Sequence, residues 1–185
     1  MRRTVITVVC TLLAVVLLQL ALYSGWMVFG GHRPLKPAER ALLIREGDSA
    51  IAHREVPVAA MVFYGDSMIG VGHNTVQQDS NIAGHAEINA INNAIRRLGY
   101  ERFMRLGRDS LRVVTTFEPC LMCRGALLEY GIKHVEFIKG KSPWFWLHED
   151  LRTAAYQLNR MQRDNGGLQD SLFDGYHRRW PATNP

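Results

Sequence analysis

Four side chains in two short motifs have the types and the spacing of a metal site with a carboxylate beside it. One residue separates His85 from Glu87, and two residues separate Cys120 from Cys123. Two cysteines at positions i and i+3 lie on the same face of a helix, so both can bind one ion. A helix N-terminus also favours their thiolate forms. Because thiolate and imidazole ligands suit zinc, we predict that His85, Cys120 and Cys123 bind Zn²⁺.

The number of ligands predicts an open site. The remaining cysteine, Cys10, lies in an apolar N-terminal run and supplies no fourth ligand. Structural zinc sites use four protein ligands, whereas hydrolytic sites use three and lower the pKa of a bound water to about 7. Glu87 follows His85 by two residues, so on a helix its side chain points in a different direction from that of the metal ligand His85. We therefore expect Glu87 to be catalytic, moving protons without binding the metal.

The elements that must position these residues alternate along the central part of the chain. Hydrophobic spacing and turn residues predict helices over residues 38–53, 84–98, 119–130 and 142–164, and strands over residues 57–64, 67–74, 111–116 and 133–138. Gly65 and Asp66 provide a hairpin turn, and Pro119 suits the first turn of its helix. This alternation predicts an α/β fold of three layers, α/β/α, with helices on both faces of one sheet.

The two motifs resemble the signature of the zinc-dependent cytidine and deoxycytidylate deaminase superfamily. That signature, His-x-Glu followed by Pro-Cys-x-x-Cys, is met by residues 85–87 and 119–123. Residues 55–58 and the hairpin that ends at Asn74 are similar to the branch that contains bacterial tRNA adenosine deaminases and guanine deaminases. The resemblance covers about residues 50–140. It implies a cytidine-deaminase-like sheet, a homo-oligomer, and hydrolytic deamination of an amino-bearing nucleobase with release of ammonia.

The resemblance also implies substrate contacts. Asn74 and the backbone of Ala86 take substrate-binding roles, although turn geometry is an alternative reason for an asparagine at a hairpin end. The expected substrate is a free base, a nucleoside or a nucleotide. Trp144, Phe145 and Trp146 are candidates for stacking on the base, with helix packing as the alternative.

Two alternative functions stay open at this point. The first is tRNA adenosine deamination, but residues 75–83 and the residues after 140 depart from the pattern of those enzymes. The formal charge of +5 falls to +3 without Arg2 and Arg3, which does not favour nucleic acid as a partner. The second is a catalytically silent zinc-binding module tethered to a membrane. The carboxylate of Glu87 argues against it, because a structural zinc site has no need of one.

The N-terminal segment is expected to anchor the chain in a membrane. Residues 4–30 contain no charged side chain and are long enough for one transmembrane helix, with a cleaved signal peptide as the alternative. A basic tail before such a run favours an extracytoplasmic, periplasmic domain. The predicted organisation is a transmembrane anchor over residues 1–30, a linker over 31–37, a zinc deaminase domain over 38–165 and a polar C-terminal tail over 166–185.

Overall fold

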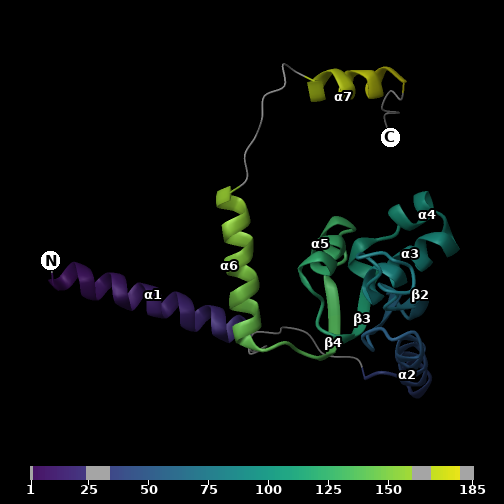
Figure 1. Cartoon of the computed structure of the whole chain (residues 1–185), viewed down its shortest axis with the longest axis horizontal. Coiled ribbons are helices and arrows are strands. Elements are labelled where there is room, and N and C mark those ends of the chain that lie inside the picture. The colour runs from purple at the N-terminus through teal and green to yellow at the C-terminus, as the bar shows by residue number, and fades with distance from the viewer. Residues whose placement is uncertain (1, 24–33, 160–167, 180–185) are drawn as a thin grey trace. The chain divides into compact units, whose positions relative to one another are not determined.

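The computed structural model describes residues 2–23, 34–159 and 168–179 of the chain. It divides into two units, Met1–Leu147 and His148–Pro185. The elements labelled in Figure 1 are α1 (Arg2–Tyr23), α2 (Pro37–Ala52), β1 (Ala59–Tyr64), β2 (Ser67–His73), α3 (Ala86–Leu98), α4 (Tyr100–Met104), β3 (Leu111–Phe117), α5 (Leu121–Glu129), β4 (His134–Lys139), α6 (Pro143–Asn159) and α7 (Leu168–Arg179). A short 3₁₀ turn, Arg108–Ser110, leads into β3.

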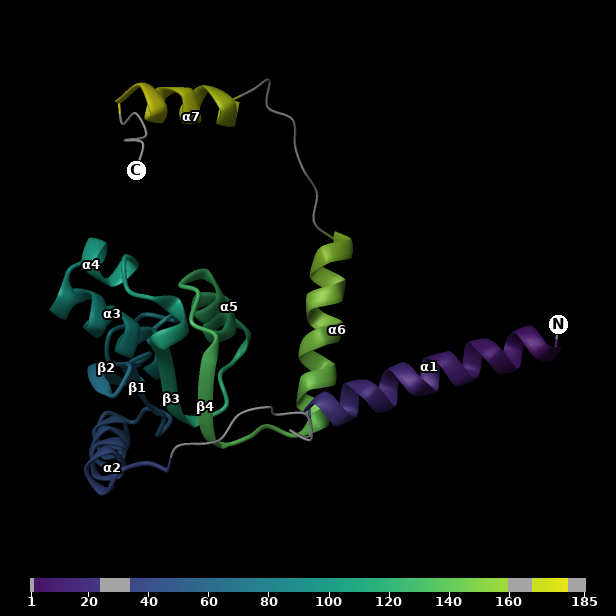
Figure 2. The ribbon, with the colours of Figure 1, turned by 180° about the vertical axis from the view of Figure 1, so that it is seen from behind.

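The four strands form one mixed sheet in the order β2-β1-β3-β4 (Figure 2). β1 pairs with β2 and with β3 in antiparallel fashion, while β3 and β4 are parallel. The β1–β2 hairpin turns at Gly65, whose φ of 57° lies in the left-handed region that glycine adopts without strain. The parallel pair needs a crossover connection, which α5 supplies.

Alternation along the strands gives the sheet two covered faces. Ala59, Met61 and Phe63 of β1 pack with Leu43 of α2 on one face. Ala60 and Val62 face the other way and join a second core cluster, whose members on α3, β3 and α5 include Ala90, Ile91, Leu111, Val113 and Leu127. The sheet therefore lies between α2 on one side and α3 with α5 on the other, which confirms the expected three-layer α/β/α arrangement.

Small residues let α3 approach the sheet closely. A Cβ on Gly72 of β2 would lie 2.7 Å from the backbone nitrogen of Ala90. Asn89 and Asn93 of α3 complete the docking, because their Nδ2 groups donate to the carbonyl oxygens of His73 at 2.8 Å and of Val71 at 2.7 Å. The start of α3 is thus held firmly against the hairpin.

Each predicted helix and strand is observed with shifts at some boundaries, and α4 and α7 are additional helices that were not predicted. α5 begins at Leu121, so Pro119 precedes the helix and does not occupy its first turn. Cys120 keeps an extended backbone at ψ 172°, and His85 likewise at ψ 151°, which makes both residues N-caps. Where only a polar tail was expected after residue 166, the structure contains α7. The predicted boundary between residues 165 and 166 lies outside the described residues.

The expected transmembrane helix is not supported. Helix α1 takes up the predicted apolar run as far as Tyr23, and residues 24–30 of that run lie outside the described part of the chain. Among the residues that the structure describes, no helix is long and apolar enough to span a membrane. The extracytoplasmic placement of the domain stays a prediction.

Candidate active site

The three predicted metal ligands converge at the starts of two helices. His85 caps α3 and Cys120 caps α5, while Cys123 lies in the first turn of α5. Each of the three pairs of ligand atoms, taken among His85 Nδ1, Cys120 Sγ and Cys123 Sγ, is 3.6 Å apart. Among the described residues this is the group of histidine, cysteine or acidic side chains placed to hold a metal.

These separations fit zinc. With Zn–S distances of about 2.3 Å and a Zn–N distance of about 2.0–2.1 Å, tetrahedral angles place two sulfurs about 3.8 Å apart and a sulfur about 3.6 Å from a nitrogen. The sulfurs of Cys120 and Cys123 are too far apart for a disulfide, whose S–S distance is about 2.05 Å. The donor set therefore fills three corners of a zinc tetrahedron and leaves one corner for another ligand.

The two thiols differ in their acidity. The hydrogen-bonding contact with the Cys123 side chain, whose Sγ is 3.6 Å away, lowers the pKa of Cys120 to about 5. The same hydrogen bond, with burial and the nearby Glu87 carboxylate, raises the pKa of Cys123. A cation bound between them favours the thiolate form of both.

Glu87 lies beside the ligands without belonging to them. Its side chain is buried, with 3% of the residue exposed. The Cys123 thiol donates to its Oε2 at 3.4 Å, and the Thr115 hydroxyl donates to its Oε1 at 3.2 Å. A buried carboxylate in this position can exchange a proton with a molecule at the open corner of the site.

Asn74 and Ala86 are also brought together. The backbone N–H of Ala86 donates to Asn74 Oδ1 at 2.9 Å, and Asn74 is buried at the end of β2. This contact determines the orientation of the Asn74 amide, because only its oxygen can accept a hydrogen bond from an N–H group. Asn74 Nδ2 consequently faces away from the first residue of α3.

A cavity of about 420 Å³ opens over these residues. Its lining combines the metal-site residues with apolar, acidic and amide side chains of the surrounding loops: Glu55, Val56, Val58, Asn74, Val76, Gln77, His85, Glu87, Phe117, Glu118, Cys120, Lys141 and Phe145. Glu55 supports one wall, since its carboxylate accepts from the backbone N–H groups of Gln77 and Gln78. Every lining residue belongs to the first unit.

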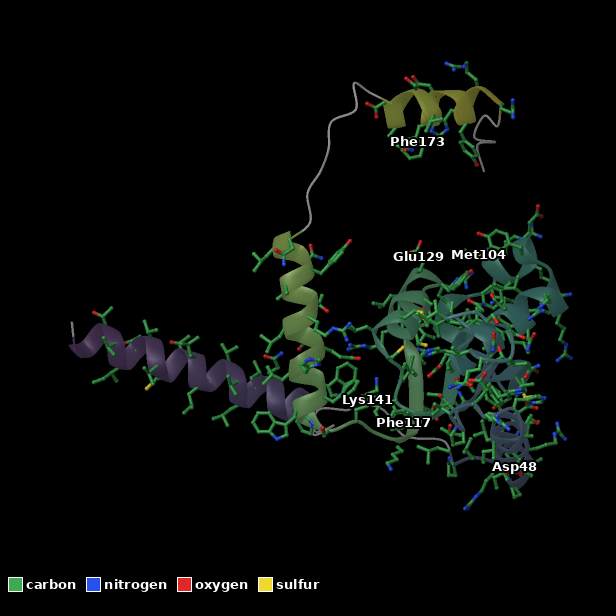
Figure 3. All side chains as sticks on the ribbon, viewed as in Figure 1. Asp48, Met104, Phe117, Glu129, Lys141 and Phe173 are labelled. Atoms are coloured by element: carbon green, nitrogen blue, oxygen red, sulfur yellow. The ribbon has the colours of Figure 1, made fainter. Side chains whose placement is uncertain are left out.

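The opposite wall is held by Glu118. Its Oε2 accepts from the backbone N–H of Lys141 at 2.6 Å and from Trp146 Nε1 at 3.2 Å. The ammonium of Lys141 lies 4.4 Å from the centre of the Phe145 ring and 6.0 Å from that of Phe117. Figure 3 labels Phe117 and Lys141 close to each other beside the end of β4.

The three candidate stacking residues separate in the structure. Phe145 lines the cavity, whereas Trp146 is buried with the Arg124 guanidinium 3.7 Å from its ring centre, and Trp144 is 78% exposed. The sequence interpretation assigned no site role to Glu55, Glu118, Lys141 or Thr115. Only Glu118 carried a usable signal, because it lies two residues before Cys120 in the same motif.

Comparison with known proteins identifies relatives of this fold and motif. Residues 38–139 match the family described as the cytidine and deoxycytidylate deaminase zinc-binding region. The tRNA-specific adenosine deaminase of Aquifex aeolicus (strain VF5) is 34% identical over 94 residues, which are 51% of this chain and 59% of that protein. The chain therefore spans little more than half the length of that relative.

Two solved structures are also similar. Guanine deaminase from Nitrosomonas europaea shares 26% sequence identity, with a TM-score of 0.51 and coverage of 77% of this chain and 76% of that one. Guanine deaminase from Bacillus subtilis shares 20% identity, with a TM-score of 0.58 and coverage of 79% of this chain and 97% of that one. At 20% identity the second likeness concerns the fold alone.

Proposed function

The chain belongs to the family that carries the cytidine and deoxycytidylate deaminase zinc-binding region, and on that premise we propose that it catalyses the hydrolytic deamination of an amino-bearing nucleobase. One observation supports this most. A three-ligand metal site with one open corner lies beside the buried carboxylate of Glu87, on the wall of a cavity of about 420 Å³. A structural zinc site would need neither the open corner nor the carboxylate.

The metal ligands and Glu87 have different roles in the proposed reaction. His85, Cys120 and Cys123 would hold zinc, which would supply a Lewis acid that lowers the pKa of a water at the open corner. Glu87 takes a proton from water and delivers it to a ring nitrogen of the base. The water oxygen bonds to the ring carbon, its second proton passes through Glu87 to the amino nitrogen, the C–N bond to that group breaks, and ammonia leaves. Water and the amino base thus become the oxo base and ammonia.

Asn74 and Phe145 are the proposed contacts to the base. The oxygen of the Asn74 amide is engaged by Ala86, which leaves Nδ2 as a donor to a ring nitrogen or oxo group of the substrate. Phe145 lines the same cavity and offers an aromatic face to a planar ring. In this proposal Ala86 acts by holding Asn74.

We propose a purine as the free base or nucleoside. The Nitrosomonas europaea relative is named as a guanine deaminase and the Aquifex relative as a tRNA-specific adenosine deaminase, and both act on purines. The cavity lining carries the carboxylates of Glu55, Glu87 and Glu118 against the single ammonium of Lys141. This balance favours an uncharged ring over a phosphate-bearing substrate.

Adenosine in tRNA is the second candidate, supported by the 34% identity to the Aquifex enzyme. Binding of a polyanion releases counterions and weakens steeply with salt. A rate with tRNA that falls sharply as salt rises, with no rate on free bases or nucleosides, would favour this candidate.

The experiment measures ammonia release by the full chain loaded with zinc. Guanine, adenine, cytosine, their nucleosides and their monophosphates are offered to the wild type and to Glu87→Gln. We expect release from a purine base or nucleoside, and a kcat about 10²- to 10⁴-fold lower in Glu87→Gln at unchanged zinc content. Equal rates in both proteins would remove Glu87 from the mechanism. Zinc binding without release from any compound or from tRNA would instead indicate a silent module.

A further inference from the structure

Thr115 is a polar residue on an otherwise apolar face of β3. Leu111 and Val113, which precede it on the same face, belong to the core cluster under α3 and α5. Thr115 is equally buried, with 0% exposure. Thr115 pairs with Ala60 on β1 and with Phe137 on β4. Because the side chain of Ala60 is small, the side chain of Thr115 has room beside it. A valine would fit this position in shape and in β-propensity.

The hydroxyl of Thr115 has two acceptors within reach. Its Oγ1 lies 3.2 Å from Glu87 Oε1 and 3.1 Å from the carbonyl oxygen of Phe117. A hydroxyl has a single proton, and a hydrogen bond to a charged acceptor is stronger than one to a neutral carbonyl. Donation to the carboxylate of Glu87 is therefore favoured over donation to the carbonyl of Phe117.

The two carboxylate oxygens of Glu87 have different partners. Oε1 accepts from the Thr115 hydroxyl at 3.2 Å, and Oε2 accepts from the Cys123 thiol at 3.4 Å. The hydrogen bond from Thr115 therefore holds Oε1 toward β3, while Oε2 lies on the side of the metal-site residues.

We propose that Thr115 is a positioning residue for deamination, acting by fixing the carboxylate of Glu87 in its working orientation. This role rests on the proposed function of Glu87. The adjacent Thr116 provides a matched control, because it points to the opposite face of the sheet, where its Oγ1 accepts from the backbone N–H of Ala59 at 3.0 Å. The same substitution at the two positions removes one hydroxyl from each face.

Kinetics of the zinc-loaded full chain test the proposal. In Thr115→Val we expect kcat on the substrate identified above to fall about 10- to 100-fold, with KM changed by less than about twofold. Thr115→Ser should restore most of kcat because it returns the hydroxyl. Thr116→Val should keep the wild-type kcat. Wild-type kcat in Thr115→Val, or an effect on KM alone, overturns the proposal.

A double-mutant cycle tests the same contact without activity. The free energy of unfolding in urea is measured for the zinc-loaded wild type, Thr115→Val, Glu87→Ala and the double variant, because alanine removes the acceptor that glutamine would keep. We expect the double variant to lose clearly less free energy than the sum of the single losses, whereas Thr116→Val with Glu87→Ala should be additive. Additive losses for Thr115 with Glu87 overturn the contact. A wild type that releases no ammonia refutes the proposed function but leaves this cycle decisive for Thr115.

Discussion

At the residue scale, Asn74 is constrained at one end of its amide and faces the cavity with the other. Its oxygen accepts from Ala86, so Asn74→Asp keeps the acceptor and removes only the two N–H donors of Nδ2. We expect this variant to raise KM for the purine substrate about tenfold, because a hydrogen bond to the base is lost. Steady-state kinetics on the zinc-loaded chain provide the measurement.

The matched control for Asn74 is Asn93. Its Nδ2 donates to the carbonyl oxygen of Val71 outside the cavity lining, so Asn93→Asp should lower the free energy of unfolding and leave KM unchanged. A wild-type KM in Asn74→Asp would show that Asn74 holds the start of α3 and does not bind the substrate.

At the scale of elements, the site depends on how closely α3 approaches β2. Gly72→Ala would place a methyl group 2.7 Å from the backbone of Ala90, and helix backbone cannot move aside as a flexible side chain can. We expect a loss of about 1–3 kcal/mol in the free energy of unfolding. Because the ligand His85 is the N-cap of α3, zinc affinity should fall as well. Urea unfolding and chelator competition measure the two effects.

Gly47 of α2 is the control for this prediction. A Cβ there meets nothing within 4 Å, so Gly47→Ala should stabilise the helix by about 0.5–1 kcal/mol and leave zinc affinity unchanged. Equal effects of the two substitutions would mean that close packing of α3 does not support the site.

The central elements could be predicted because their signals are local. Turn residues and alternation located the β1–β2 hairpin, and the two motifs located the starts of α3 and α5. The five-residue helix α4 is too short for hydrophobic spacing to reveal. Helix α7 was not predicted. Its apolar residues Leu172, Phe173 and Tyr176 are exposed and do not form a buried face of the helix.

The ligand set could be predicted because residue types and spacing determine it. The walls of the cavity could not, because their contacts join residues distant in sequence. Glu118 accepts hydrogen bonds from Lys141 and Trp146, which follow it in the chain only after α5 and β4. Glu55 accepts from the backbone of Gln77, which follows the β1–β2 hairpin. Thr115 reads as an ordinary strand residue until the fold brings Glu87 to it.

At the scale of the whole molecule, the site is contained in one unit. The residues that build it run from Glu55 to Trp146, and the family match covers residues 38–139. All of the chemistry assigned to the site therefore draws on side chains of the first unit, Met1–Leu147.

Reaction in ¹⁸O-labelled water tests the central claim most directly, since it follows the bonds that the site is proposed to make and break. The zinc-loaded full chain is incubated with guanine, adenine and their nucleosides. The masses of the products are measured by mass spectrometry, and the released ammonia is quantified. We predict one ammonia for each product molecule, and one labelled oxygen in place of the lost amino group. Unchanged purines, with one zinc bound per chain, would contradict the account.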